Sequence, residues 1–234
     1  MNVLAVGCHP DDLEIGCGGT LIKYVKAGHK VFMCHITNGD MGHKVIKPEE
    51  LGPIRIKEAK KAAELIGAEH ITLNVSDNAD YLFSKETEEK LIEVIRYTKP
   101  DIIITHNDKD YSAQHEATCE AVKSLSFAAT VPHIITRSEH ISNVPPIFYM
   151  DTLAGTRFIP SEYVDITQEI ELKLQALACH ESQIKWMSDH DKINFLDFVK
   201  TCSKFRGLQC GVPYAEAFRQ YAEWPRLRPY RLLP

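Results

Sequence analysis

Short apolar runs alternate with amphipathic segments along the first half of the chain. Four runs are short and apolar enough to predict β-strands, at residues 3–7, 30–37, 70–73 and 101–105. Between them, apolar residues recur every three or four positions, which predicts helices with one buried face. The run at residues 102–104 does not alternate with polar residues, as expected for a strand covered by helices on both sides. This βαβ repetition predicts an α/β fold with a Rossmann-like, doubly wound, mostly parallel sheet flanked by helices.

The pattern becomes less regular beyond about residue 130, where prolines interrupt the chain. We expect two further strands at residues 145–151 and 163–166, a long helix from 168 to about 183, and another helix at about 195–205. The 234 residues are enough for one large core and too few for two comfortable domains. We therefore predict a single domain over residues 1–234, with a regular βαβ core at 1–128 and a less regular extension at 129–234.

Composition and charge narrow the class of protein. Hydrophobic residues make up 44% and charged residues 25%, which are the proportions of an ordinary globular chain. The net charge of −5 offers no basic field for a phosphate backbone, so nucleic acid is not an expected partner. The seven cysteines form no CxxC pair, which favours reduced thiols in the core. The start of the chain does not resemble a signal peptide and no apolar run has membrane-spanning length, which predicts a cytoplasmic protein with no membrane partner.

The residues directly after the first strand carry the first candidate chemistry. Gly7 is followed by Cys8 and then by the run His9-Pro10-Asp11-Asp12. A dinucleotide-binding protein has a glycine-rich turn here, and two carboxylates would repel a pyrophosphate, which disfavours an NAD-dependent oxidoreductase. An imidazole and two carboxylates within four residues favour a metal site, for which zinc is the natural ion. A single Asp would be better explained as the cap of a helix beginning near Gly18, but the whole run is not.

A third metal ligand is expected from the segment after the fourth strand. In a doubly wound sheet, ligands gather beyond the carboxyl ends of the strands, where the first and fourth strands commonly lie side by side. His115 is the predicted ligand, just inside a helix that Ser112 could cap. His106, close to the end of its strand, is the competitor. For either one the alternative is a hydrogen-bonded loop histidine.

These motifs resemble those of the PIG-L/LmbE family of zinc-dependent N-acetylglucosaminyl deacetylases. Residues 3–37 are similar to the start of that family, with HPDD followed by a GCGGT helix start, and the likeness continues at residues 53–59, 163–183 and 211–218. The resemblance covers essentially the whole chain. It implies that His9, Asp12 and His115 bind zinc, that Asp11 is the general base, and that Arg55 contacts the sugar.

The second motif departs from the family pattern. The family usually has Asp-x-His-x-Asp-His, whereas this chain has Asp110-Tyr111-Ser112-Ala113-Gln114-His115, so Ser112 replaces a supporting His and Gln114 a supporting Asp. This chain therefore lacks, at these two positions, the His that would stabilise the oxyanion and the carboxylate that would support the metal ligand. The candidates to replace the His are His106, His180 and Tyr214.

Other residues near the motifs have structural or binding roles in this interpretation. Ser112 and Asp110 join Arg55 as candidate substrate-binding residues, and Asp110 either orients His115 or starts the turn. We expect Glu14 to close its loop by hydrogen bonding and His180 to be a packed residue at a helix end. The segment at about 128–162 is expected to shape the pocket for the acceptor part of the substrate.

The predicted function is hydrolytic removal of an N-acetyl group from an N-acetylglucosamine-type sugar conjugate. Zinc would lower the pKa of water from about 15.7 to near 7, and Asp11 would take the proton and pass it to the departing amine. The small N-acetylated amino sugar could belong to a specialised biosynthetic pathway, such as that of a thiol cofactor or an aminosugar antibiotic. The resemblance also suggests a homo-oligomer, without specifying the number of subunits. The alternative is a zinc- or sugar-binding module with little catalysis, which the altered second motif favours and the intact Asp11 disfavours.

Overall fold

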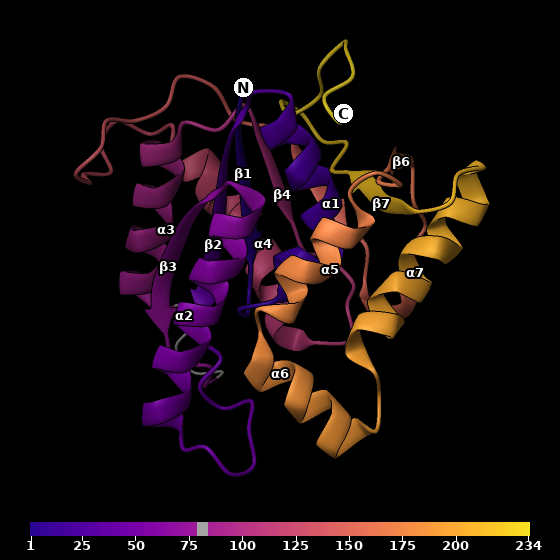
Figure 1. Cartoon of the computed structure of the whole chain (residues 1–234). Coiled ribbons are helices and arrows are strands. Elements are labelled where there is room, and N and C mark those ends of the chain that lie inside the picture. Colours follow the sequence, from indigo (N-terminus) through magenta and orange to yellow (C-terminus); the bar gives the residue numbers. More distant parts are fainter. Residues whose placement is uncertain (79–83) are drawn as a thin grey trace.

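The computed structural model, which describes residues 1–78 and 84–234, is built on one sheet of seven strands (Figure 1). The strand order is β3-β2-β1-β4-β5-β7-β6, and β7 runs antiparallel to both of its neighbours while the other pairs are parallel. The strands are β1 (Asn2–Gly7), β2 (Lys30–Thr37), β3 (Glu69–Val75), β4 (Ile102–Thr105), β5 (Ile147–Met150), β6 (Glu162–Asp165) and β7 (Ala215–Gln220). The predicted doubly wound α/β sheet is confirmed.

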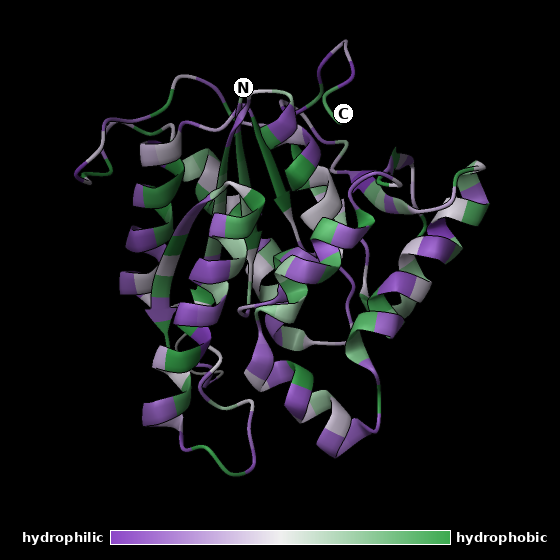
Figure 2. Cartoon of the chain, in the orientation of Figure 1, coloured by the Kyte–Doolittle hydropathy of each residue, from purple (hydrophilic) through white to green (hydrophobic). Residues whose placement is uncertain are grey.

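Helices cover both faces of the sheet because the strand residues alternate between two apolar cores. Val3 and Ala5 of β1 lie in the core under α1, α2 and α5, whereas Leu4 and Val6 lie in the core under α3 and α4. Figure 2 shows the apolar strands enclosed by helices whose outer positions are polar. The helices are α1 (Asp12–Lys26), α2 (Pro48–Ile66), α3 (Lys85–Thr98), α4 (Ala113–Ala128), α5 (Ile170–Ala178), α6 (Glu181–Trp186) and α7 (Phe195–Cys210). None of the helices in this described part of the chain could cross a membrane.

The carboxyl ends of β1, β2 and β4 meet at one edge of the sheet. β1 pairs with β2 on one side and with β4 on the other, so that Gly7 lies opposite His35 and Val6 opposite Thr105. The loops that follow these strands therefore start side by side. This is the point where the strand order reverses, and it confirms the expected meeting of the first and fourth strands.

The first helix begins earlier than the sequence predicts. α1 starts at Asp12 and not near Gly18, and Asp11 stands at its N-cap in the left-handed region with φ 109° and no capping bond from its side chain. Glycine is needed inside this helix because a Cβ at Gly19 would lie 2.8 Å from Cγ2 of Ile166. The GCGG run thus lets the helix pack closely and does not begin it.

A buried ion pair is bonded into the backbone of α1. Glu216 accepts hydrogen bonds from the backbone N–H groups of Gly19 and Thr20, and Lys173 donates to the carbonyl oxygen of Ile15. Nζ of Lys173 lies 2.6 Å from Oε1 of Glu216, and both side chains are almost fully buried. The pair therefore ties α5 and β7 to the middle of the first helix.

Two predictions for the second half need correction. The long helix expected at 168–183 is two helices, because the chain leaves the α-helix at Cys179 and His180, whose N–H groups bond to carbonyl oxygens three residues back. The strand β7 was missed, since its sequence AEAFRQ contains three polar residues. The helix expected at about 195–205 is present as α7 and continues to Cys210.

Candidate metal centre and active site

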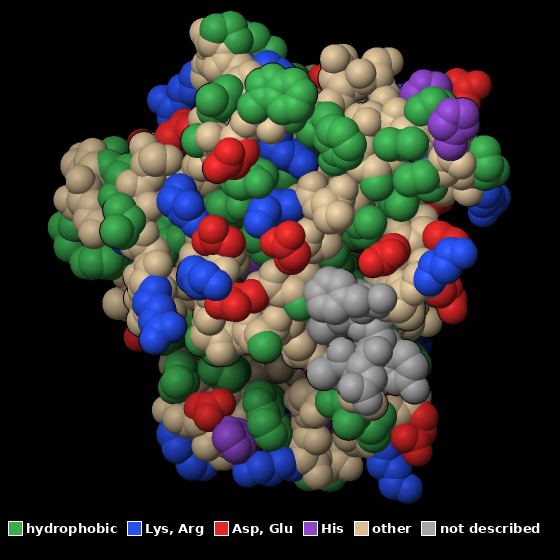
Figure 3. Space-filling model, turned by 180° about the vertical axis from the view of Figure 1, so that it is seen from behind, with side chains coloured by type: hydrophobic (Ala, Val, Ile, Leu, Met, Phe, Trp, Pro, Cys, Tyr) green, Lys and Arg blue, Asp and Glu red, His purple; other side chains and the backbone are tan. Residues whose placement is uncertain are grey.

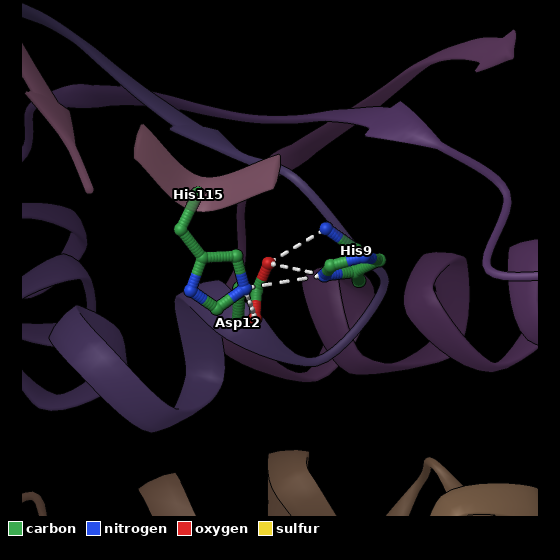
Figure 4. A group of neighbouring side chains, drawn as sticks. All are labelled: His9, Asp12 and His115. Carbon is green, nitrogen blue, oxygen red and sulfur yellow. Dashed lines mark hydrogen bonds and ion pairs between the residues drawn. The ribbon is translucent and has the colours of Figure 1, made fainter. Parts of the chain in front are cut away.

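His9, Asp12 and His115 meet at the carboxyl edge of the sheet (Figure 4). Nε2 of His115 lies 3.2 Å from Nδ1 of His9 and 3.4 Å from Oδ1 of Asp12, while Oδ2 of Asp12 lies 3.4 Å from Nδ1 of His9. In a tetrahedral zinc site with bonds of about 2.0–2.1 Å, neighbouring ligand atoms are about 3.3–3.4 Å apart. The two ring nitrogens and the carboxylate oxygens of Asp12 are thus spaced to hold such an ion, and their nitrogen and oxygen chemistry suits it.

Each residue of this group reaches it from a different local structure. His9 lies on the turn after β1, Asp12 is the first residue of α1, and His115 lies in the first turn of α4. Oδ2 of Asp12 also accepts a hydrogen bond of 2.6 Å from the backbone N–H of His9, which closes the turn. Burial alone would raise the pKa of Asp12, but His115 beside it holds the pKa well below its ordinary value, so the carboxylate is ionised.

The far nitrogen of each histidine contacts a carboxylate. Nδ1 of His115 lies 3.1 Å from Oδ1 of Asp110, which also accepts a bond from the N–H of Ser112. Asp110 thus contacts both His115 and the turn, so its two alternative roles are compatible, and its expected role in substrate binding stays a prediction. Nε2 of His9 lies 2.9 Å from Oδ1 of Asp77. Such partners fix the ring orientation and tautomer of metal-binding histidines.

Asp77 is a site residue that the sequence interpretation missed. It follows the end of β3 by two residues and so lies at the same edge of the sheet as the motifs. Its place beyond a parallel strand was the available signal, because the loops after β1, β2 and β3 begin at one edge.

His106 does not join His9 and Asp12 in the first group of ligands. Its Nε2 accepts a hydrogen bond of 2.9 Å from the backbone N–H of Cys8, and its ring stacks on that of His115 with centroids 4.0 Å apart. Burial lowers the pKa of His106 to about 4, so the ring is neutral. It also belongs to a second compact group, with Asp110 and His115.

Asp11 lies beside this group and is held by Arg55. Oδ2 of Asp11 is 3.3 Å from Nη2 of Arg55. The same Nη2 donates to the carbonyl oxygen of Pro10, and Nη1 donates to that of Gly39. Burial raises the pKa of Asp11 to about 6, and the Arg55 guanidinium opposes that rise. The positive φ of Asp11 costs of order 1–3 kcal/mol, which these contacts offset.

The group opens into a cavity of about 450 Å³, within the usual range for small-molecule sites. Its polar wall includes the metal-binding group with Asp11, Arg55 and Asp77. Its apolar wall includes Ile15, Met150, Leu153, Trp186, Met187 and Phe195. Of the segment 128–162, which was expected to shape the pocket, Met150, Asp151 and Leu153 line the cavity. The sequence interpretation missed the part of the lining that comes from α6 and from the turn of π-helix after it, Met187–Asp191.

The other candidate residues are distributed unevenly around this cavity. Ser112 stands at the N-cap of α4 and is not among the residues that line the cavity in the described chain. Of the three candidates to replace the missing His, only His106 lines it. His180 is fully buried and its Nε2 lies 3.2 Å from Oε1 of Glu14. Glu14 therefore binds a distant helix end and does not close its own loop.

Comparisons with known proteins agree with this architecture. Residues 4–126 match the family described as PIG-L, GlcNAc-PI de-N-acetylase. The chain is similar to the diacetylchitobiose deacetylase of Thermococcus kodakarensis, with 28% identity over 93% of this chain and 82% of that protein. The structure is similar to N,N'-diacetylchitobiose deacetylase of Pyrococcus horikoshii, with a TM-score of 0.80, 28% identity and coverage of 93% and 82% of the two chains.

A further solved structure shows that the fold is shared more widely. GalB, the 4-carboxy-2-hydroxymuconate hydratase of Pseudomonas putida KT2440, superimposes with a TM-score of 0.83 at 19% identity, covering 99% of this chain and all of that one. At this identity the likeness concerns the fold alone. The family match, in contrast, spans more than half of the sequence and includes both the HPDD run and His115, and the chain therefore belongs to the PIG-L family.

Proposed function

We propose that this protein is a zinc-dependent N-deacetylase that acts on a small, uncharged conjugate of an N-acetylated amino sugar. The observation that carries the proposal is the position of Asp11, a carboxylate that lies next to the metal-binding group without belonging to it. Such a group is suited to proton transfer during amide hydrolysis. The names of the diacetylchitobiose deacetylases to which the chain is similar support the same chemistry.

His9, Asp12 and His115 would hold the zinc ion. Zinc supplies Lewis-acid chemistry, which polarises a carbonyl group and makes water acidic at neutral pH. With three protein ligands, the site keeps a position open for substrate or water, as catalytic zinc sites do.

Asp11 would accept the proton of the attacking water and give it to the departing amine. Arg55 holds the carboxylate in place through its contacts with Asp11 and the neighbouring carbonyl oxygens. One residue can serve both steps because water loses a proton when it attacks and the amine gains one when the C–N bond breaks. The products are acetate and a free amino sugar.

The charges of the cavity favour an uncharged acceptor. Its described lining includes six carboxylates, those of Asp11, Asp12, Asp77, Asp110, Asp151 and Asp191. They are countered by Arg55, by Arg206, which binds Asp151, and by a divalent ion when it is bound. The remaining negative charge would repel a phosphate or carboxylate on the substrate. The aromatic and aliphatic wall around Trp186 would contact the apolar face of a sugar ring.

The test is release of amine from N-acetylated mono- and disaccharides by the zinc-loaded protein. Amine release with zinc bound supports the proposal. If the protein binds zinc but releases amine from none of these sugars or their conjugates, the proposal fails, and a binding module with little catalysis becomes the better explanation. The cytoplasmic location and the homo-oligomer suggested by the sequence stay predictions.

A further inference from the structure

His9 has a carboxylate partner although the second motif lacks the usual Asp. Gln114 stands at that motif position, and its Oε1 lies 2.9 Å from Nε2 of His9. Oδ1 of Asp77 lies at the same distance, 2.9 Å, from the same nitrogen. Nε2 of Gln114 in turn donates to the backbone oxygen of Asp77 at 2.9 Å and lies 3.3 Å from its Oδ1. The three side chains therefore form a closed set of contacts.

The two ring nitrogens of His9 face different partners. Nδ1 of His9 faces Asp12 and His115, so it is the nitrogen available to a metal ion. The ring hydrogen must then lie on Nε2, where both acceptors are found. A carboxylate that accepts this hydrogen fixes the tautomer and makes the imidazole a stronger ligand.

Asp77 is held in place independently of His9. Its backbone N–H donates to Oδ1 of Asp40 at 2.8 Å, and the hydroxyl of Ser76 donates to Oδ2 of Asp40 at 2.9 Å. The loop that carries Asp40 follows β2, and the N–H of Asn38 in that loop bonds to the carbonyl oxygen of Val75 at the end of β3. The side chain of Asp77 is only 11% exposed. Neighbouring strands thus place its carboxylate.

We propose that Asp77 takes over the role of the missing motif carboxylate, and that Gln114 bridges it to His9. Asp77 is then a positioning residue for the metal ligand, supplied by the loop after β3 and not by the second motif. This inference rests on the metal centre of the proposed function, but not on the identity of the sugar or on catalysis.

The test measures the zinc dissociation constant by competition with a chromogenic chelator. The variants are Asp77→Ala, Gln114→Asp and the double variant, with Asp189→Ala as the control. Asp189 is exposed and is not among the described residues that line the cavity. We expect Asp77→Ala to weaken zinc binding about 10- to 100-fold, as loss of such a partner typically does. The control should bind zinc as the wild type does.

The double variant distinguishes positioning from general damage. Asp77→Ala combined with Gln114→Asp restores a carboxylate at the motif position, so zinc affinity should return toward the wild-type value. In the Gln114→Asp single variant, two carboxylates would face one N–H group, and no gain in affinity is expected. Thermal unfolding of the metal-free proteins checks that each variant folds, and Asp77→Asn serves as the smaller change if Asp77→Ala does not.

The competing role for Asp77 is direct contact with substrate. Unchanged zinc affinity in Asp77→Ala, with a raised KM alone, would overturn the positioning role. Loss of affinity without recovery in the double variant would also overturn it. If zinc affinity follows the expected pattern while no sugar is deacetylated, the proposed function fails and the positioning role stands. Nitrogen-15 NMR of the zinc-loaded protein should place the ring hydrogen of His9 on Nε2.

Discussion

The Arg55 guanidinium lies 3.3 Å from the Asp11 carboxylate and at the same time donates hydrogen bonds to the backbone carbonyl oxygens of Pro10 and Gly39. Arg55 is only 3% exposed, so this contact is not a loose surface ion pair. It holds the HPDD turn against the loop that follows β2. Arg55 also lines the cavity, and its expected contact with the sugar stays a prediction.

Asp11→Asn should abolish most of the activity while leaving zinc bound. The amide keeps the size of the side chain but cannot accept a proton, and loss of a general base typically lowers kcat by about 10²- to 10⁴-fold. Steady-state kinetics with metal analysis of the same preparation would measure this. A zinc-loaded variant with kcat within tenfold of the wild type would remove Asp11 from its proposed role.

Removal of the metal should abolish activity and lower the melting temperature. A ligand that binds only the folded state stabilises it by mass action, so zinc should restore both properties. His115→Ala should no longer bind one equivalent of zinc tightly, whereas His190→Gln should, because His190 is half exposed and stacks on Trp186. Equal zinc content in the two variants would argue against His115 as a ligand.

Conjugates with a carboxylated acceptor should be poorer substrates than neutral ones of matched size. The net negative charge of the cavity predicts a kcat/KM at least about tenfold lower for the carboxylated conjugate than for the neutral one. High salt screens exposed charges and should reduce this difference in kcat/KM. Asp191→Asn should also reduce the difference in kcat/KM between the two conjugates, since Asp191 lines the cavity and is partly exposed. A preference for the acid would contradict the proposed substrate class.

Glu216→Ala should destabilise the fold by about 3–5 kcal/mol, because it leaves Lys173 buried without its partner. It also leaves the N–H groups of Gly19 and Thr20 without the carboxylate that accepts them. Urea unfolding of the metal-free protein would measure the loss. Glu223→Ala, at an exposed position in the C-terminal segment, is the control and should change stability by less than about 0.5 kcal/mol.

Acid should weaken the fold through His35. This side chain is fully buried, neither of its ring nitrogens has a hydrogen-bond partner among the described residues, and burial lowers its pKa to about 3. An unfolded histidine titrates near 6.5, so only the unfolded chain gains this proton between about pH 6.5 and 3. The contribution of His35 to stability is therefore complete above about pH 6.5 and is lost as the pH falls.

The measurement for His35 compares the free energy of unfolding at pH 7 and pH 5. His35→Leu should lose less stability than the wild type over this interval, because leucine does not titrate. His133→Gln, at an exposed position, should keep the wild-type dependence. An identical pH dependence in His35→Leu and the wild type would exclude this role.

Local patterns were enough to predict six of the seven strands and a metal site near His9 and His115, whereas the choice of Asp12 over Asp11 as a ligand came from the family resemblance. The strands are short apolar runs, and His9, Asp12 and His115 follow strand ends that a parallel sheet brings together. Asp77 could not be assigned so easily because a single Asp after a strand has many explanations. Its role depends on its distance from His9, which only the folded chain supplies.

The apolar wall of the cavity could not be predicted from the spacing of apolar residues in the sequence. Trp186 and Met187 lie where α6 gives way to a turn of π-helix, beyond residue 183, where the predicted helix ended. At the break between α5 and α6, His180 contacts Glu14, a residue far away in the chain. The surface seen in Figure 3, by contrast, mixes acidic and basic side chains, as the small net charge suggests.

The ion pair of Lys173 and Glu216 gives the molecule an order of assembly. α1 carries Asp12 at its first residue, yet two N–H groups in its middle bond to a carboxylate on the last strand of the sheet. During synthesis, α1 can therefore form its bonds to Glu216 only after nearly the whole chain has been made. A protein shortened before β7 would keep every residue of the metal-binding group in its sequence but would lack the carboxylate that bonds to the middle of α1.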